Sequence, residues 1–172
     1  MPRSSVPSPF VTYVEATALG FATGLRSLTP FALLSLVAYR QPTMWSDRFG
    51  SQVPWRLLGS PNVRTGLELS AVGELVGDKL PFAFSRASPP GLAQRCINGA
   101  LAGATRSLLD GRSAWPGGAL GALAAAGGAA LGYRYRTTVP GRTGVPDAIW
   151  AVAEDLVAIG LSVWSLRRFL RS

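Results

Sequence analysis

Carboxylate side chains interrupt several otherwise apolar stretches of this 172-residue sequence. Glu15 lies in the first stretch, and Glu74 and Asp78 lie together in a later one. Because Glu74 and Asp78 are four residues apart, a helix would place both on one face. A charge in apolar surroundings is costly unless it faces a partner, a bundle interior or a water-filled cavity. These acids are therefore candidates for binding a cation or relaying a proton, or for buried ion pairs that fix helix register.

The last apolar stretch carries two adjacent acids, Glu154 and Asp155. Successive residues of a helix point about 100° apart, so we expect only one of them, Glu154, to face a shared interior site. Arg26 and Arg106 also interrupt apolar stretches, and they are the candidate counter-ions. The candidates for a polar network or an ion-binding site are Glu15, Arg26, Glu74, Asp78, Arg106, Glu154 and Asp155.

Two absences limit the chemistry that these residues could perform. The sequence has no His, and Cys96 is its single cysteine. This excludes a Ser-His-Asp triad, a Cys-His dyad, an imidazole metal site, an internal disulfide and a thiolate zinc cluster. Intramembrane aspartyl proteases use a GxGD pattern, which the residues before Asp78 do not match. We therefore expect no enzyme activity, no metal and no cofactor.

The composition favours a membrane protein over an ordinary soluble domain. Charged residues make up 15% of the chain, whereas soluble domains carry about 25%. The net charge of +8 comes mainly from arginines scattered between apolar stretches, which is typical of membrane flanks and argues against nucleic-acid binding. The mean hydropathy is only +0.24, so a soluble, alanine-rich helical protein remains the alternative.

Helices must position the candidate residues, and we expect one membrane domain over residues 1–172. Residues 10–39 are predicted to form a kinked or broken span, because Pro30 lacks an amide donor and clashes with the preceding turn. Residues 40–62 are rich in Pro, Gly, Ser and Trp; they are predicted to form an extramembrane loop, with Trp45 and Trp55 at headgroup level. Further helices are predicted at 63–80, 91–110, 113–134 and 146–168.

Pairs of glycines four residues apart recur through the apolar stretches. In a bilayer such pairs let two helix backbones approach closely. We expect them to pack helices within the bundle or between copies of the chain. The pairs are Gly20/Gly24, Gly73/Gly77, Gly99/Gly103, Gly117/Gly121 and Gly128/Gly132.

Two short matches suggest that the sequence has two related halves. The tripeptide RSL at 26–28 recurs at 106–108, and the pattern AVxE at 71–74 recurs at 151–154. Over the whole 80-residue offset the identity barely exceeds what the composition gives, so a duplication stays one alternative. The predicted fold class is an all-α, Gly/Ala-packed membrane bundle of five or six spans, with two inverted three-helix repeats as one option.

Several motifs together resemble a known family. They are GLRSLTP at 24–30, ELVGDKLP at 74–81, GALAG at 99–103 and AED at 153–155. From about Phe10 to Leu166 the chain resembles the small bacterial integral membrane proteins catalogued as domain of unknown function 4126 (DUF4126). The resemblance implies a multi-pass helical protein of a bacterial cytoplasmic membrane, and it implies no activity. The stretch at 40–62 carries none of these signatures.

Two functions remain open. The first is a small transporter or channel-like protein for a cation or polar solute, in which Glu74, Asp78 and Glu154 line a polar centre with Arg26 and Arg106 nearby. The second is a non-transporting membrane scaffold or assembly protein that oligomerises through its GxxxG faces. The expected partners are the lipid bilayer, a small ion or polar solute and further copies of the chain, and nucleic acid is not among them.

Overall fold

The chain is built from α-helices. The computed structural model describes residues 7–77, 89–143 and 147–171; these ranges contain helices and no strand, which confirms the predicted all-α class. The helices of the described part are α1 (Pro9–Leu25), α2 (Thr29–Arg40), α3 (Pro42–Phe49), α4 (Trp55–Leu58), α5 (Pro61–Gly77), α6 (Pro89–Leu109), α7 (Ala114–Thr143) and α8 (Asp147–Leu170).

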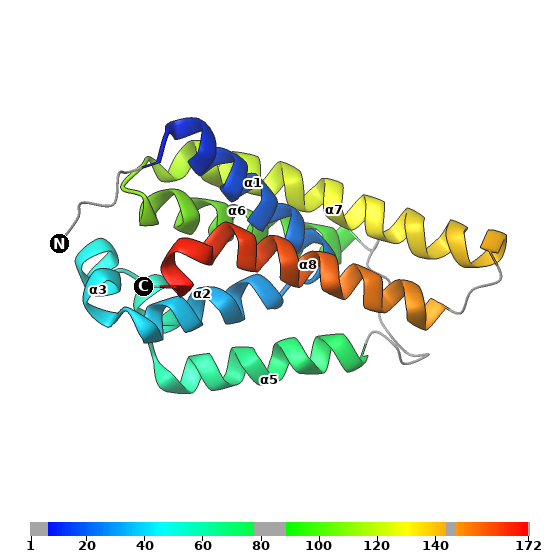
Figure 1. Cartoon of the computed structure of the whole chain (residues 1–172), viewed down its shortest axis with the longest axis horizontal. Coiled ribbons are helices and arrows are strands. Elements are labelled where there is room, and N and C mark those ends of the chain that lie inside the picture. Colours follow the sequence, from blue (N-terminus) through cyan, green and yellow to red (C-terminus); the bar gives the residue numbers. More distant parts are fainter. Residues whose placement is uncertain (1–6, 78–88, 144–146, 172) are drawn as a thin grey trace.

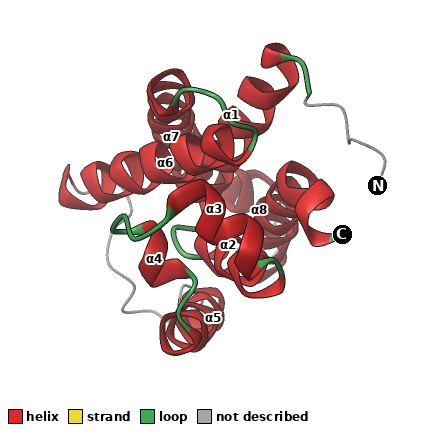
Figure 2. Cartoon of the chain, turned by 90° about the vertical axis from the view of Figure 1, so that its left-hand side faces the viewer, coloured by secondary structure: helices red, strands yellow, loops and turns green. Residues whose placement is uncertain are grey.

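The longer helices α1, α2, α5, α6, α7 and α8 run back and forth along one common direction (Figure 1). The start of α1 and the end of α8 consequently lie at the same end of the bundle, near α3. The turn from α1 to α2 lies part-way along the bundle, since α7 and α8 both extend beyond it. Figure 2 shows α5 on the outside of the bundle, and its main packing partner is α2.

Prolines begin most of these helices, because the fixed φ of proline suits the first turn and its missing amide donor costs nothing there. The same preference separates α1 from α2. α1 ends at Leu25 and α2 starts at Thr29, with Pro30 in its first turn. The predicted kinked or broken span is thus two antiparallel helices. Other prolines at helix starts are Pro9, Pro42, Pro61 and Pro89.

Glycines bring the backbones of α1, α6 and α7 into direct contact. A Cβ added to Gly20 would lie 2.4 Å from the Cα of Gly121, and one added to Gly121 would lie 2.2 Å from the carbonyl oxygen of Gly99. Real Cβ atoms are not found this close, so only glycine fits. Other glycines in the same position between these three helices are Gly24, Gly103, Gly117 and Gly128.

Gly73 departs from the predicted packing role. It lies on an outward face of α5, where a Cβ would meet nothing within 4 Å in the described part of the chain. α5 ends at its partner Gly77, whose surroundings lie outside the described side chains. Gly73 therefore makes no helix contact in the described part of the chain that corresponds to those of α1, α6 and α7.

The segment predicted to be a loop, 40–62, contains the short helices α3 and α4 and packs into the bundle. Trp45 is only 4% exposed, and its indole donates to the carbonyl of Trp55 at 2.9 Å. The ring of Trp55 stacks on Phe49, and its indole donates to Thr105 of α6 at 2.9 Å. Trp45 and Trp55 therefore pack inside the protein and cover one end of the hydrophobic core, and their placement at headgroup level stays a prediction.

The helices related by the 80-residue offset do not pack in equivalent ways. α6 lies against α7 over much of its length, whereas α1 and α2 contact each other only sparsely. α7 also continues past the predicted end at 134, since no helix breaker follows before Pro140, and it ends at Thr143, three residues after that proline. The contacts between helices therefore do not repeat with the 80-residue offset.

Charged and apolar side chains are distributed in an unusual way. Within the described ranges, the largest fully buried side chains are those of Arg26 and Arg106, while Leu69 is 68% exposed and Leu123 is 72% exposed. A water-soluble protein buries apolar side chains and leaves arginine at the surface. Among the described residues, one helical segment, Ile149–Leu170, is long and apolar enough to cross a membrane, with a mean hydropathy of 1.5.

Candidate functional site

The break between α1 and α2 is surrounded by charged residues from other helices. Helix ends leave amides and carbonyls without partners inside the helix, and here those ends lie within the bundle. We call the surrounding group the break cluster; its members are Arg26, Glu74, Arg95, Glu154 and Asp155.

Two side chains of opposite charge hold the two helix ends at the break. Arg95 of α6 donates to the carbonyl oxygens of Gly24 at 2.6 Å and Leu25 at 3.3 Å. Glu74 of α5 accepts from the backbone amides of Ser27 at 2.8 Å and Leu28 at 3.0 Å. A cation thus faces the negative end of α1 and an anion faces the positive start of α2, which is the favourable arrangement for both helix dipoles.

Arg26, between the two helices, is fully buried and reaches α8. Its Nε donates to Asp155, and its Nη2 lies 4.0 Å from Glu154 Oε2. Glu154 and Asp155 are both buried, so the expectation that only Glu154 faces the interior is wrong. The guanidinium group presents donors on two edges, and it can therefore meet two carboxylates that point in different directions from α8.

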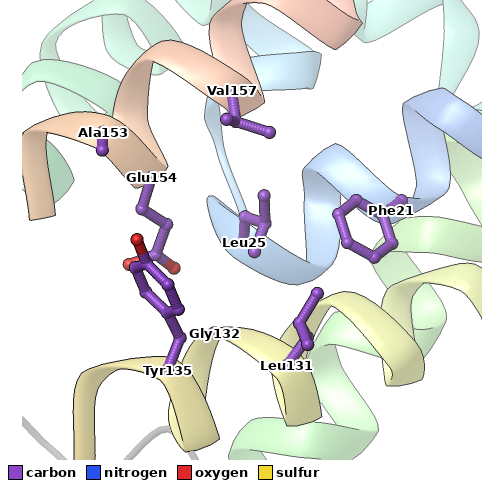
Figure 3. Close-up of a pocket in the computed structure, with 8 residues that line it drawn as sticks. All are labelled: Phe21, Leu25, Leu131, Gly132, Tyr135, Ala153, Glu154 and Val157. Carbon is purple, nitrogen blue, oxygen red and sulfur yellow. The ribbon is translucent and has the colours of Figure 1, made fainter. Parts of the chain in front are cut away.

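Glu154 also borders a pocket between α1, α7 and α8. The pocket has a volume of about 390 Å³, and apart from Glu154 and Tyr135 its walls are apolar. Figure 3 shows the Glu154 side chain extending from α8 towards Gly132 and Tyr135 of α7. A Cβ at Gly132 would lie 2.9 Å from Glu154 Oε1. Gly132 thus makes room for this carboxylate and does not pair two helix backbones.

A second buried group of charges lies at the end of the bundle that holds both termini. Arg106 of α6 pairs with Glu15 of α1, and its Nη1 lies 2.9 Å from Asp110. Arg167 of α8 reaches Glu15 at 3.0 Å, and Arg168 reaches both Glu15 and Asp110. We call these five residues the end cluster. It ties the start of α1, the end of α6 and the end of α8 together.

The spacing of charges on α1 and α6 explains why there are two clusters. Glu15 lies on α1, and Arg26 follows it by 11 residues, just past the last helical residue Leu25, while Arg95 and Arg106 are 11 residues apart on α6. Eleven residues are about three helical turns, or roughly 16 Å, so Arg95 and Arg106 share one face of α6 and lie at two different levels of the bundle. The two helices are antiparallel. Glu15 therefore meets Arg106 at one level, and Arg95 meets the backbone next to Arg26 at the other.

The predicted candidates consequently do not form one polar centre. Arg26, Glu74, Glu154 and Asp155 lie together at the break, while Glu15 and Arg106 lie in the end cluster. Asp78 lies outside the described residues. Sequence reasoning missed Arg95 and Asp110. The signals that point to them were the matched spacing of 11 residues on α6 and the four-residue separation of Asp110 from Arg106.

The chemistry of both clusters is that of carboxylates and guanidinium groups. Within the described part of the chain, no group of three or more His, Cys, Asp or Glu side chains is placed to hold a metal ion. Carboxylates can bind a cation or carry a proton, and arginines hold them in place. Of these acids, Glu154 is the one that lines the pocket between α1, α7 and α8.

Comparison with known proteins agrees with the motifs read from the sequence. No curated protein and no solved structure matches the chain. A family model matches residues 14–167, from the second turn of α1 to the last turns of α8. The chain therefore belongs to the family described as domain of unknown function (DUF4126).

Proposed function

We propose that this chain is a multi-pass protein of the bacterial cytoplasmic membrane and that it transports or conducts a small cation or polar solute. The buried arginines and the exposed apolar side chains support the membrane setting. Phe10 is 77% exposed and Trp115 is 87% exposed, and Leu69 and Leu123 are also largely exposed. In water such surfaces mark interaction sites, and in a bilayer they meet lipid tails.

The helix lengths support a bundle that crosses a bilayer. At 1.5 Å per residue, the 21, 30 and 24 residues of α6, α7 and α8 are enough for a hydrocarbon core of about 30 Å. α2 has only 12 residues, which is too short to cross alone. α1 and α2 together form a pair whose turn lies inside the bundle, where other helices cover its backbone. Irregular backbone at membrane depth is tolerated only under such cover.

The break cluster is the observation that carries the transport proposal. Secondary transporters bind their substrates near the ends of interrupted helices, where backbone dipoles and charged side chains converge. Here the end of α1, the start of α2, Glu74 and Glu154 converge in the same way, and Glu154 faces a pocket. The structure supports Glu74 and Glu154 as the carboxylates that bind the solute, with Arg26 and Arg95 fixing the geometry. Asp78 stays a candidate from the sequence.

A flux measurement in proteoliposomes tests this proposal. We expect the protein to carry K⁺, Na⁺ or H⁺, and both Glu154→Gln and Glu74→Gln to abolish that flux. The matched control is Glu68→Gln, because Glu68 lies on α5 before Glu74 and its exposed side chain pairs with Arg64. Flux in the control should equal that of the unmodified protein. Full flux in both test variants would contradict the proposal, and so would the absence of flux above that of empty liposomes for these ions and for organic cations alike.

The scaffold alternative is supported by the outer face of α5. Gly66 and Gly73 are seven residues apart on this helix, and a Cβ on either would meet nothing within 4 Å in the described part of the chain. Leu69 and Val72 are exposed beside them. Cross-linking in native membranes tests this function. A dimer lost on Gly73→Leu, together with no flux of any tested ion, would favour the scaffold over the transporter.

A further inference from the structure

The pocket between α1, α7 and α8 has a distinctive lining. Phe21 and Leu25 of α1, Leu131 and Tyr135 of α7, and Val157 of α8 surround a space of about 390 Å³. Such a volume suits a small organic molecule and far exceeds what a bare metal ion needs. An apolar space of this kind offers poor solvation to a fully polar solute. The lining therefore favours a ligand whose body is largely apolar.

The pocket opens sideways on the surface of the bundle. Leu131 is 57% exposed and Val157 is 49% exposed although both line the pocket. α7 and α8 contact each other far less than α6 and α7 do, so these two helices leave an opening between them. In the proposed membrane setting this opening faces the lipid. An amphiphilic molecule could enter from the bilayer without crossing the polar ends of the bundle.

One polar corner gives the pocket its chemical preference. Glu154 supplies a carboxylate, with Oε2 on the Arg26 side and Oε1 close to Gly132 of α7. The aromatic rings of Tyr135 and Phe21 line the same space, and Figure 3 shows Tyr135 beside the Glu154 carboxylate. A carboxylate next to aromatic rings recognises ammonium groups by charge and by cation–π attraction. The same corner repels an anion.

We propose that this pocket binds a monovalent amphiphilic organic cation, an alkyl- or arylammonium with an apolar body. Its ammonium group lies against Glu154 and Tyr135, and its apolar part lies among Phe21, Leu25, Leu131 and Val157. The inference rests on the proposed function, since it names the class of cation that the transporter carries. The break cluster alone is equally compatible with an inorganic ion. The lining of the pocket makes an ammonium amphiphile the substrate instead.

Binding can be measured on the full-length protein in lipid nanodiscs. The probe is benzyltrimethylammonium, and its matched controls are the anion 3-phenylpropanoate and the neutral 3-phenylpropan-1-ol. We expect the cation alone to raise the unfolding temperature, because it binds only the folded protein. Glu154→Gln should weaken its binding by roughly tenfold or more, given the strength of interactions with a charged group.

A second variant keeps Glu154 intact. Leu131→Trp fills the pocket from a position that already faces outward, and it should abolish binding. Leu123→Trp is its control, because Leu123 is also exposed on α7, at 72% against 57% for Leu131, but does not line the pocket. Equal binding of the cation, the anion and the alcohol, or unchanged binding in both Glu154→Gln and Leu131→Trp, would overturn the inference.

The same samples separate this inference from the transport proposal. Flux of K⁺, Na⁺ or H⁺ that depends on Glu154, without any binding of benzyltrimethylammonium, overturns the inference and leaves the transporter standing. Binding that depends on Glu154, without flux of any tested cation including the probe, supports the pocket and overturns transport. Binding together with uptake of the probe supports both.

Discussion

Glu15 on α1 and Arg106 on α6 form an ion pair in which neither side chain exposes any surface. The pair is part of a larger group, because Asp110, Arg167 and Arg168 reach the same two residues. Buried charges are tolerated only when each has partners, and the loss of one partner leaves the others uncompensated. The consequences of removing Glu15 and of removing Arg106 should therefore differ.

Replacing Glu15 should destabilise the protein more than replacing Arg106. Glu15→Leu leaves Arg106, Arg167 and Arg168 facing Asp110, and we expect a loss of about 3–5 kcal/mol. Arg106→Met leaves Arg167 and Arg168 to neutralise Glu15 and Asp110, so its cost should be smaller. Unfolding of the solubilised protein by denaturant measures both changes. Equal losses, or a larger loss in Arg106→Met, would show that the charges do not act as one group.

The contact of three helices at Gly121 should be intolerant of a single methyl group. In Gly121→Ala the new Cβ would lie 2.2 Å from the carbonyl oxygen of Gly99, and the backbones must separate at a cost of about 1–3 kcal/mol or more. Gly73→Ala is the control, because its Cβ enters open space. There we expect a gain of about 0.5–1 kcal/mol from the higher helix propensity of alanine. Thermal unfolding of both variants gives the comparison.

Glu74 should slow the hydrogen exchange of the backbone amides at the start of α2. Glu74→Gln replaces a charged acceptor of two backbone amides with a neutral one. We expect the amides of Ser27 and Leu28 to exchange hydrogen faster by roughly tenfold, since a bond to a charged acceptor is the stronger kind. Exchange measured by mass spectrometry should leave α7 unchanged. Unaltered exchange at 26–29 would mean that Glu74 does not hold this helix start.

The orientation of the bundle follows from its arginines. The end that holds both termini carries Arg40, Arg48, Arg112, Arg167, Arg168 and Arg171. At the opposite end, the last part of α7 includes Arg134, Arg136 and Arg142. Because cytoplasmic segments carry the excess of positive charge, we expect both termini to be cytoplasmic. A C-terminal green fluorescent protein fusion should fluoresce, and a C-terminal alkaline phosphatase fusion should be inactive; an active phosphatase would contradict this orientation.

Local features of the fold could be predicted from the sequence with simple rules. The chain is helical because its apolar stretches hold helix formers, and prolines begin the helices. The structural break at 26–28 lies within the run Gly24–Pro30, where Pro30 removes an amide donor. The motifs were sufficient to identify the family. The helices, their starting points, the break and the family motifs all depend on residues that are neighbours in the sequence, and a single sequence can therefore reveal them.

The site depends on contacts between distant residues and was therefore only partly predictable. Candidates such as Arg26 and Glu154 could be found from their unusual setting, but nothing local separates them from Glu15 and Arg106 into two clusters. That separation arises from the antiparallel register of α1 and α6. The burial of Trp45 was missed for a similar reason, because α3 is too short for a periodic pattern and its position depends on stacking with residues of other helices.

The glycine contacts restrict how this protein can change shape. At Gly121 the backbone of α7 touches those of α1 and α6, and no side chain lies between them that could repack to absorb a displacement. Interfaces of this kind do not slide gradually, because close-packed surfaces have few alternative arrangements. α1, α6 and α7 should therefore move as one rigid body. Any gating motion that opens the break must come from α2 and from α5 and α8, the helices that carry Glu74, Glu154 and Asp155.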